Sequence, residues 1–390
     1  MNDKIKTIYD ALSVVSVFTD TVERPLVKTF FSFVEGTTIE EKRKAYGKFV
    51  AKIYEVGGDL TDAVRTLLAE DENVYVKAMA NGKSIPAHIE NATKRELAVF
   101  SSFAALTKAD FEKTLNGTDL PDFDSEKADF QKEYKERLES IGQYGYGVFA
   151  SYGMFRFSDE KKIEPIASAD KIRLNHFIGY ETERKKVYDN TLAFTQNRPA
   201  ANVLLYGDAG AGKSSTVKAI ANEFFDKGVR LIELRKDQLC HLPLVMEKIS
   251  HNPLKFILFI DDLSFQQSDD NFSMLKAALE GSASARTKNC IIYATSNRRH
   301  IVKESFSDRE GGDVHRNDTL QETLSLSERF GLTVLFGKPD KKLYLQIVKE
   351  LAERNGLYYT EQMGIEAEAF ALKKGNRSAR GAEQFIDSLL

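Results

Sequence analysis

The stretch LLYGDAGAGKSSTV, residues 204–217, constrains the fold more than any other part of the chain. Gly207, Gly212, Lys213 and Ser214 match the pattern G-x-x-x-x-G-K-S/T, in which glycines let backbone N–H groups curl around phosphates. An apolar, strand-like run precedes the loop, and the helix-like run STVKAIANEFF follows it. A strand, a phosphate loop and a helix in this order predict an α/β sheet, and they disfavour a chance glycine-rich turn.

The loop predicts both a phosphate site and a metal site. We expect Lys213 to supply a cation to the β and γ phosphates, and the Ser214 hydroxyl to complete a magnesium shell. The helix N-terminus adds a partial positive charge. The expected nucleotide contacts in the loop are Gly207, Asp208, Ala209, Gly210, Ala211, Gly212, Lys213, Ser214 and Ser215.

A second element, FILFIDDLSF, ends an apolar run with two acids. Asp261 is predicted to lie at the carboxyl end of a buried strand beside the phosphate loop, where it holds magnesium through water. Asp262 follows at a position where a base polarises an attacking water. A solvated turn is the alternative, which the phosphate loop makes weaker.

Polar residues also end the run CIIYATSN, in which Asn297 is predicted to orient the water or sense the γ-phosphate. A plain strand-end cap is the alternative for this asparagine.

Three arginines are further candidates. Arg329, in LSLSERFGLTVLF, precedes another strand; supplied by a neighbouring subunit, it is a candidate for stabilising charge on the transferred phosphoryl group. Arg380 and Arg377, in GNRSARGAEQF, are candidates to reach back to the nucleotide. For each arginine the alternative is an ordinary helix surface.

Composition bounds the class of protein. The 390 residues are 42% hydrophobic and 29% charged, which predicts folded domains. A net charge of -3 gives nucleic-acid binding little support. Cys240 and Cys290 stand far apart without metal spacing, so a disulfide framework or zinc site is disfavoured and a reducing cytoplasm fits. No apolar run reaches membrane-spanning length, and we expect no contact with a membrane.

Periodicity divides the chain into four parts. Residues 1–145 are mainly helical, as in TTIEEKRKAYGKFVAKIY, where a capping box opens a one-sided apolar pattern. Residues 146–171 contain aromatic and β-branched residues around a polar turn, which indicates a β-hairpin or linker. Buried-looking strands alternate with helices over 172–336, the pattern of a parallel α/β sheet. Residues 337–390 are predicted to form a small helical lid.

These motifs, in this order, resemble those of the AAA+ ATPases: Walker A at GDAGAGKSS, Walker B at FILFIDD, sensor 1 at ATSN, an arginine finger at SERFG and sensor 2 at SARGAEQF. The resemblance implies ATP and Mg²⁺ held between an α/β core and a helical lid, in rings or filaments where Arg329 acts on the next subunit's ATP. It implies a sensor 2 role for Arg380, and it places Phe177, Ile178 and Gly179 near the adenine.

A closer resemblance is to a bacterial AAA+ family of ATP-binding proteins whose cellular role is not defined, with a helical N-terminal region and an Asp-Asp Walker B. The pair Asp261-Asp262 is also similar to that of replication initiators and helicase loaders, which favours a slow switch over a fast motor.

The leading hypothesis is an ATPase that binds ATP and ADP and binds an unknown protein partner through its N-terminal part. A nucleotide-gated interaction module with little hydrolysis and a DNA-associated ATPase are the alternatives. A small-molecule kinase is disfavoured.

Overall fold

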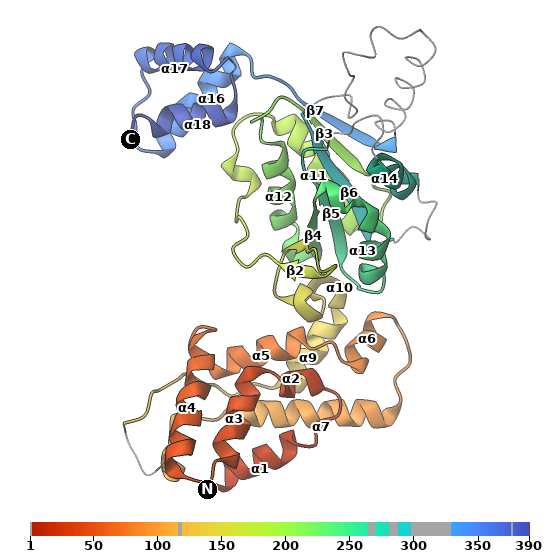
Figure 1. Cartoon of the computed structure of the whole chain (residues 1–390), viewed down its shortest axis with the longest axis vertical. Coiled ribbons are helices and arrows are strands. Elements are labelled where there is room, and N and C mark those ends of the chain that lie inside the picture. The colour runs from red at the N-terminus through yellow and green to blue at the C-terminus, as the bar shows by residue number, and fades with distance from the viewer. Residues whose placement is uncertain (1, 116–118, 264–269, 281–287, 298–328, 376) are drawn as a thin grey trace. The chain divides into compact units, whose positions relative to one another are not determined.

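The computed structural model describes residues 2–115, 119–263, 270–280, 288–297, 329–375 and 377–390. The chain forms two compact units, one of residues Met1–Ser151 with His251–Pro253 and one of Tyr152–Ser250 with Leu254–Leu390. Figure 1 labels their helices and strands. None of the helices in the described ranges is long and apolar enough to cross a membrane.

The N-terminal unit is helical. Side-chain caps begin several of its helices: Thr38 accepts from the Glu41 N–H in a full capping box, Asp59 caps the next helix, and Asn73 the one after. The elements are α1 (Asp3–Leu12), α2 (Thr19–Val22), α3 (Pro25–Glu35), α4 (Ile39–Tyr54), α5 (Leu60–Glu70), α6 (Val74–Ala80), α7 (Ala87–Ala104), α8 (Lys108–Leu115), α9 (Phe130–Glu139), α10 (Ile141–Tyr144) and the 3₁₀ turn η1 (Gly147–Ala150).

Aromatic side chains fill the centre of this unit. Phe49 of α4 is fully buried, and its ring centroid lies 5.5 Å from that of Phe111, 5.9 Å from Phe123 and 6.1 Å from Phe103. Rings at these separations pack edge to face or tilted, which adds to the free energy gained by burying their area. The core therefore joins helices from both ends of the unit's sequence.

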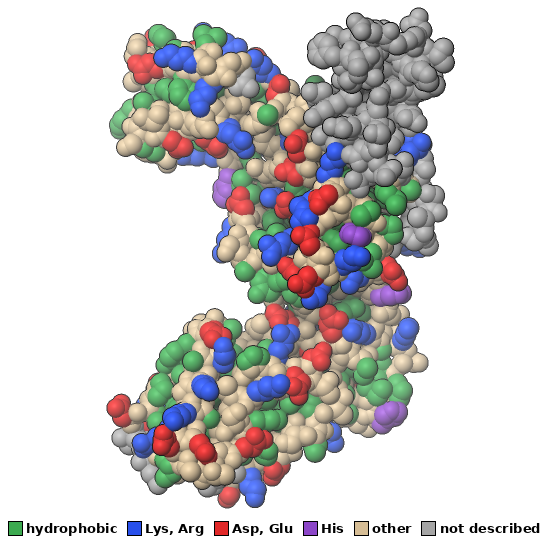
Figure 2. Space-filling model, in the orientation of Figure 1, with side chains coloured by type: hydrophobic (Ala, Val, Ile, Leu, Met, Phe, Trp, Pro, Cys, Tyr) green, Lys and Arg blue, Asp and Glu red, His purple; other side chains and the backbone are tan. Residues whose placement is uncertain are grey.

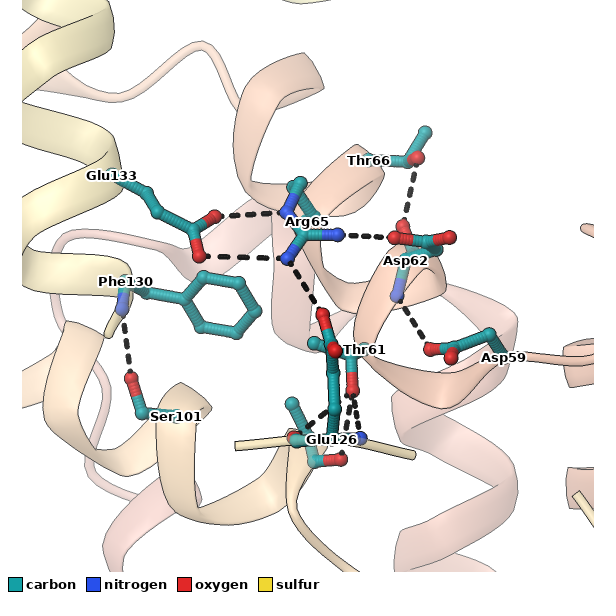
Figure 3. A network of polar contacts seen from close by, with 10 residues as sticks. Asp59, Thr61, Asp62, Arg65, Thr66, Ser101, Glu126, Phe130 and Glu133 are labelled. Atoms are coloured by element: carbon teal, nitrogen blue, oxygen red, sulfur yellow. Dashed lines mark hydrogen bonds and ion pairs between the residues drawn. The ribbon is translucent and has the colours of Figure 1, made fainter. Parts of the chain in front are cut away.

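A polar network at the unit's surface links α5 to α9 (Figure 3). Arg65 donates to Glu133 at 2.8 Å and also pairs with Asp62 and, at 3.7 Å, with Glu126. Hydrogen bonding to Glu133 raises the pKa of Arg65 above its ordinary value. The side chains are partly exposed, so we expect the network to set helix register more than to contribute stability.

A mostly parallel sheet organises the second unit. In the described part of the chain it has seven strands in the order β2-β1-β4-β5-β6-β3-β7, and only the β1–β2 pair is antiparallel. The strands are β1 (Met154–Phe157), β2 (Ile163–Pro165), β3 (Val203–Gly207), β4 (Val229–Leu234), β5 (Lys255–Ile260), β6 (Cys290–Ser296) and β7 (Leu332–Phe336). The hairpin expected within 146–171 thus adds two strands at one end of this sheet, with β2 at the edge.

Helices cover the sheet on both faces, and α12 and α13 lie on opposite sides of it (Figure 1). Val187 of α11 and Val217 and Ile220 of α12 pack against strand residues in one buried cluster. The elements are η2 (Leu174–His176), α11 (Glu181–Thr195), α12 (Lys213–Glu223), η3 (Phe225–Lys227), η4 (Lys236–His241), α13 (Leu242–Ile249) and α14 (Asp270–Glu280). The prediction of an α/β P-loop architecture is confirmed.

The C-terminal helices α16 (Lys341–Arg354), α17 (Glu361–Lys373) and α18 (Ala379–Asp387) lie in residues 337–390, the segment that the sequence predicts to be a lid and that is called the lid below. Asp340, Thr360 and Ser378 cap their N-termini through side-chain oxygens. Ile178, from the segment before α11, is buried in the lid's apolar cluster beside Ile347 and Phe385. The segment before α11 therefore packs against the C-terminal helices as well as against the sheet unit's own helices.

Candidate nucleotide-binding site

The phosphate loop connects β3 to α12 at the carboxyl edge of the sheet. Its three glycines have left-handed or otherwise positive φ values, 134° at Gly207, 76° at Gly210 and 83° at Gly212. A Cβ at Gly207 would lie 2.0 Å from the Phe336 carbonyl oxygen. Only glycine fits this path, which turns backbone N–H groups toward a common centre.

Lys213 lies at the first turn of α12 and is 6% exposed. Its Nζ donates to the carbonyl oxygens of Gly207 at 2.9 Å and Asp208 at 2.8 Å, and to Asn297 Oδ1 at 3.0 Å. Burial lowers the pKa of this amine from its ordinary value. The ammonium thus faces neutral oxygens, an arrangement that an anionic ligand would stabilise.

Ser214 and Asp261 lie next to each other, as a magnesium site requires. Ser214 Oγ donates to Asp261 Oδ1 at 2.5 Å, and Thr295 Oγ1 donates to the same oxygen. A hydroxyl and a carboxylate are the hard oxygen ligands that Mg²⁺ takes alongside phosphate oxygens and water. Across the described ranges no group of three or more His, Cys, Asp or Glu side chains is placed to hold a metal. The donor set therefore fits an ion shared with a phosphate ligand.

Asp262 and Asn297 are joined directly. Asn297 Nδ2 donates to Asp262 Oδ1 at 2.8 Å, while its Oδ1 accepts from Lys213. Asp262 has a φ of 50°, and its N–H donates to Thr295 Oγ1 at 3.0 Å. Left-handed backbone is tolerated by aspartate and is common at functional turns. One amide therefore bridges the loop's cation and the second acid of the pair.

A cleft of ≈ 550 Å³ opens beside the loop, between the core and the lid. Phe177, Ile178 and Arg380 line it, as do Gly210, Ala211, Gly212 and Ser215. Gly179 does not line it, but its carbonyl accepts from Arg184. The residues predicted near the adenine thus lie at or directly behind the wall of a cleft that begins at the phosphate loop.

The two candidate arginines of the lid differ. Arg377 donates to both oxygens of Glu368 at 2.8 Å, and this pairing raises its pKa while lowering that of Glu368. Arg380 faces the cleft, and its N–H donates to the Gly210 carbonyl at 3.4 Å. The geometry therefore favours Arg380 over Arg377 for contact with a ligand.

Arg329 lies away from the loop. It precedes β7 and lines a pocket with Asn202, which precedes β3. These strands are parallel, so Arg329 is at their amino ends and the phosphate loop at the carboxyl end. Five residues at about 3.3 Å each put about 16 Å of strand between them. Arg329 does not join the site of its own subunit.

Thr295 and Arg184 belong to the site and were missing from the sequence interpretation. Thr295 stands two residues before Asn297, and the alternation of a strand places both on one face, which is a signal that the sequence carries. Arg184 lines the cleft from α11, five residues after Gly179, but the sequence interpretation gave it no role. Only the tertiary structure places it there.

The family model described as protein of unknown function (DUF815) matches residues 150–390, more than half of the chain. The chain belongs to this family. The predicted resemblance to a family without a defined cellular role is therefore confirmed, and the match covers the sheet, the loop and the lid. No curated protein matches the sequence.

Solved structures similar to the chain include Thermotoga maritima RuvB, described as a Holliday junction branch migration motor, and AMPPCP-bound DnaA from Aquifex aeolicus. RuvB is 16% identical with a TM-score of 0.39, and the match covers 56% of this chain and 64% of RuvB. DnaA is 17% identical with a TM-score of 0.40, over 57% of this chain and 66% of DnaA. The chain thus spans less than two thirds of the length of RuvB.

Proposed function

We propose that the chain is a magnesium-dependent ATPase that hydrolyses ATP to ADP and phosphate and uses nucleotide state to change its binding of a partner. The observation that carries this proposal is the Asn297 side chain, which hydrogen bonds both to Lys213 and to Asp262. A phosphate-binding cation and a carboxylate are thereby held on either side of one amide. This arrangement suits an attacking water that lies between the γ-phosphate, bound by Lys213, and Asp262 as the base.

In the proposed reaction Asp262 accepts a proton from the attacking water, which Asn297 orients. The water oxygen bonds to the γ-phosphorus, the bond from that phosphorus to the bridging oxygen breaks, and ADP leaves with the electron pair. Lys213 offsets the charge on the β and γ phosphate oxygens. Ser214 and Asp261 would hold Mg²⁺, which when bound would neutralise charge on the same oxygens.

Arg329 requires a second subunit in this proposal, because it lies at the opposite edge of the sheet from the loop of its own chain. An arginine supplied by a neighbour stabilises the transition-state charge and contributes about 10³–10⁵ in rate. A homo-oligomer with ATP at the subunit interface follows from this role.

Coupling to the lid is supported by two hydrogen bonds to residues 336–337, which lead into it, one from the phosphate loop and one from the segment before α11. The Asp208 N–H donates to the Phe336 carbonyl at 3.2 Å, and Tyr180 donates through its hydroxyl to the Gly337 carbonyl at 2.5 Å. Phosphates that rearrange the loop therefore act on the start of the lid. In this proposal residues 172–336 hold the nucleotide, 337–390 move, and 1–145 bind a protein partner in the cytoplasm.

Phosphate release by the purified full-length protein tests the proposal. Asp262→Asn should lower the turnover number by about 10²–10⁴ while ATP still binds, because it removes only the base. Arg329→Ala should also lower turnover without loss of binding, and an equal mixture of the Arg329→Ala and Lys213→Ala proteins should regain activity at shared sites. Equal phosphate release by the wild type and Asp262→Asn contradicts hydrolysis at this site.

A nucleotide-gated interaction module is the second candidate, favoured by the acid pair itself. Asp262 is one methylene shorter than glutamate, and its Oδ1 already accepts from Asn297. In this case nucleotide binding, lost in Lys213→Ala, would control partner capture although turnover is negligible.

A function as a DNA-associated ATPase has less support, since the net charge is -3 and Figure 2 shows acidic and basic side chains interspersed on the visible face of each unit.

A further inference from the structure

Arg184 of α11 is a buried cation in the wall of the cleft. The residue is 7% exposed, and its guanidinium carbon lies 4.3 Å from the centroid of the Phe177 ring. No carboxylate of the described residues lies within ion-pair distance of it. Burial of a charge without an ionised partner is costly, so the arrangement calls for another source of negative charge.

The three guanidinium nitrogens have different surroundings. Nη1 donates to the Gly179 carbonyl, and Nε lies 3.4 Å from Thr216 Oγ1. Nη2 has no hydrogen-bond partner in the described part of the chain, and a Cβ at Gly212 would lie 3.8 Å from it. Two nitrogens therefore fix the side chain in place, and the third faces the phosphate loop.

We propose that Arg184 Nη2 donates to the α-phosphate of the bound nucleotide, which supplies the missing negative charge. This inference rests on the proposed nucleotide site and adds a residue to it. Lys213 serves the outer phosphates from within the loop. Arg184 lies beside Phe177 and Gly212, between the phosphate loop and the residues predicted to contact the adenine. In a bound nucleotide the α-phosphate is the phosphate nearest the adenosine, so it is the one expected beside Arg184.

Electrostatics agree with the geometry. Burial lowers the pKa of Arg184 to about 10, so the guanidinium stays charged at neutral pH but is less stable than it would be in water. Phe177 offsets part of this cost through its ring face. A phosphate within reach of Nη2 completes the compensation with a charge-assisted hydrogen bond. Arg184 would thereby gain in the nucleotide complex a directly hydrogen-bonded anion, in addition to the Phe177 ring that it already contacts.

The test compares ADP and the non-hydrolysable analogue AMPPCP, each with Mg²⁺, by calorimetric titration of the full-length protein. Arg184→Met keeps an unbranched apolar stem and removes the charged guanidinium, so both ligands should lose at least tenfold in affinity and by equal factors, since each carries an α-phosphate. Arg184→Lys keeps a charge without the planar fork and should lose affinity for both ligands to a smaller extent. Lys186→Gln, an exposed charge change on the same helix, should bind as the wild type does.

A thermal readout separates ligand contact from a structural role. The nucleotide-free Arg184→Met protein should melt no lower than the wild type, because it no longer buries an unpaired charge, but ADP should raise its melting temperature less. Unchanged affinity in Arg184→Met, or a loss for AMPPCP alone, overturns the proposal. If Arg184→Met does not fold, an Arg184→Lys protein that binds both ligands like the wild type overturns it. A wild type that binds neither ligand instead removes the proposed function.

Discussion

The two units of the molecule bury charged groups in opposite ways. In the N-terminal unit, Glu96 is 1% exposed, yet its carboxylate accepts from the backbone N–H groups of Ser16, Val17 and Phe18 and from the Ser16 hydroxyl. In the second unit, Lys213 and Arg184 are buried beside neutral oxygens. Among the described residues neither has a carboxylate within ion-pair distance. Glu96 is thus satisfied by groups of its own unit, whereas Lys213 and Arg184 are buried cations that a bound anion would stabilise.

This difference implies that the two units respond to different perturbations. A unit whose buried charge is satisfied internally depends on its own packing and hydrogen bonds for stability. A unit whose buried cations lack an ion-pair partner gains stability from an anion that binds them, by an amount set by ligand concentration and affinity. Each prediction below should change one unit and leave the other unchanged.

The largest expected effect is on packing in the N-terminal unit. Phe49→Ala removes a fully buried ring that contacts several others, and it should lower the unit's free energy of unfolding by about 3–5 kcal/mol. Hydrogen exchange of α3, α4 and α7 measures the change. Ile39→Ala, at a half-exposed position of the same helix, is the control and should cost far less. A change in nucleotide affinity would contradict the separation of the two units.

Next in size is the loss of nucleotide binding in Lys213→Ala. Removal of the loop's buried cation should weaken ATP and ADP binding at least 100-fold, about 2.8 kcal/mol at 1.4 kcal/mol for each tenfold change. Equilibrium titration checks it. The matched control is Lys218→Ala on the same helix, where the lysine is partly exposed and lies 3.6 Å from Glu233. Wild-type affinity in Lys213→Ala would remove the nucleotide site.

A smaller effect is expected from Glu96→Gln. The amide keeps one acceptor oxygen and turns an NH₂ group toward backbone donors, so the N-terminal unit should lose about 1–3 kcal/mol in its free energy of unfolding. Hydrogen exchange of α1 and α7 reports it. Glu90→Gln, a more exposed position on α7 that pairs with Lys94, is the control. An equally stable Glu96→Gln protein would show that this buried carboxylate does not hold the unit together.

The smallest predicted effect is a pH dependence in the second unit. Burial lowers the pKa of Lys213 from its ordinary 10.5, and bound phosphate would raise it again, so binding takes up a proton at alkaline pH. Nucleotide affinity should therefore be flat near neutrality and fall, by less than tenfold, as pH rises toward the lowered pKa. Titrations at a series of pH values measure it. An affinity that rises with alkalinity would show that Lys213 does not contact the ligand as a cation.

Much of the fold could be predicted because local patterns and tertiary demands agree. Thr38 and Glu41 form the capping box that their spacing predicts, and the strand before Gly207 ends at the phosphate loop. The apolar runs before Asp261 and Asn297 became neighbouring parallel strands, which brings both residues to one edge. The place of the hairpin strands β1 and β2 in the sheet could not be predicted, because the sequence of a short hairpin does not reveal which other strand it pairs with.

The sequence by itself determined the phosphate loop, the acid pair and the α/β order of the second unit, since each depends on residue type and short-range spacing. The tertiary structure decided which distant side chains share the site. Arg380 lines the cleft whereas Arg377 is paired with Glu368, and Arg184 faces Gly212 because α11 packs beside α12. Helix packing and ion-pair partners depend on contacts far apart in the chain, and no local pattern encodes them.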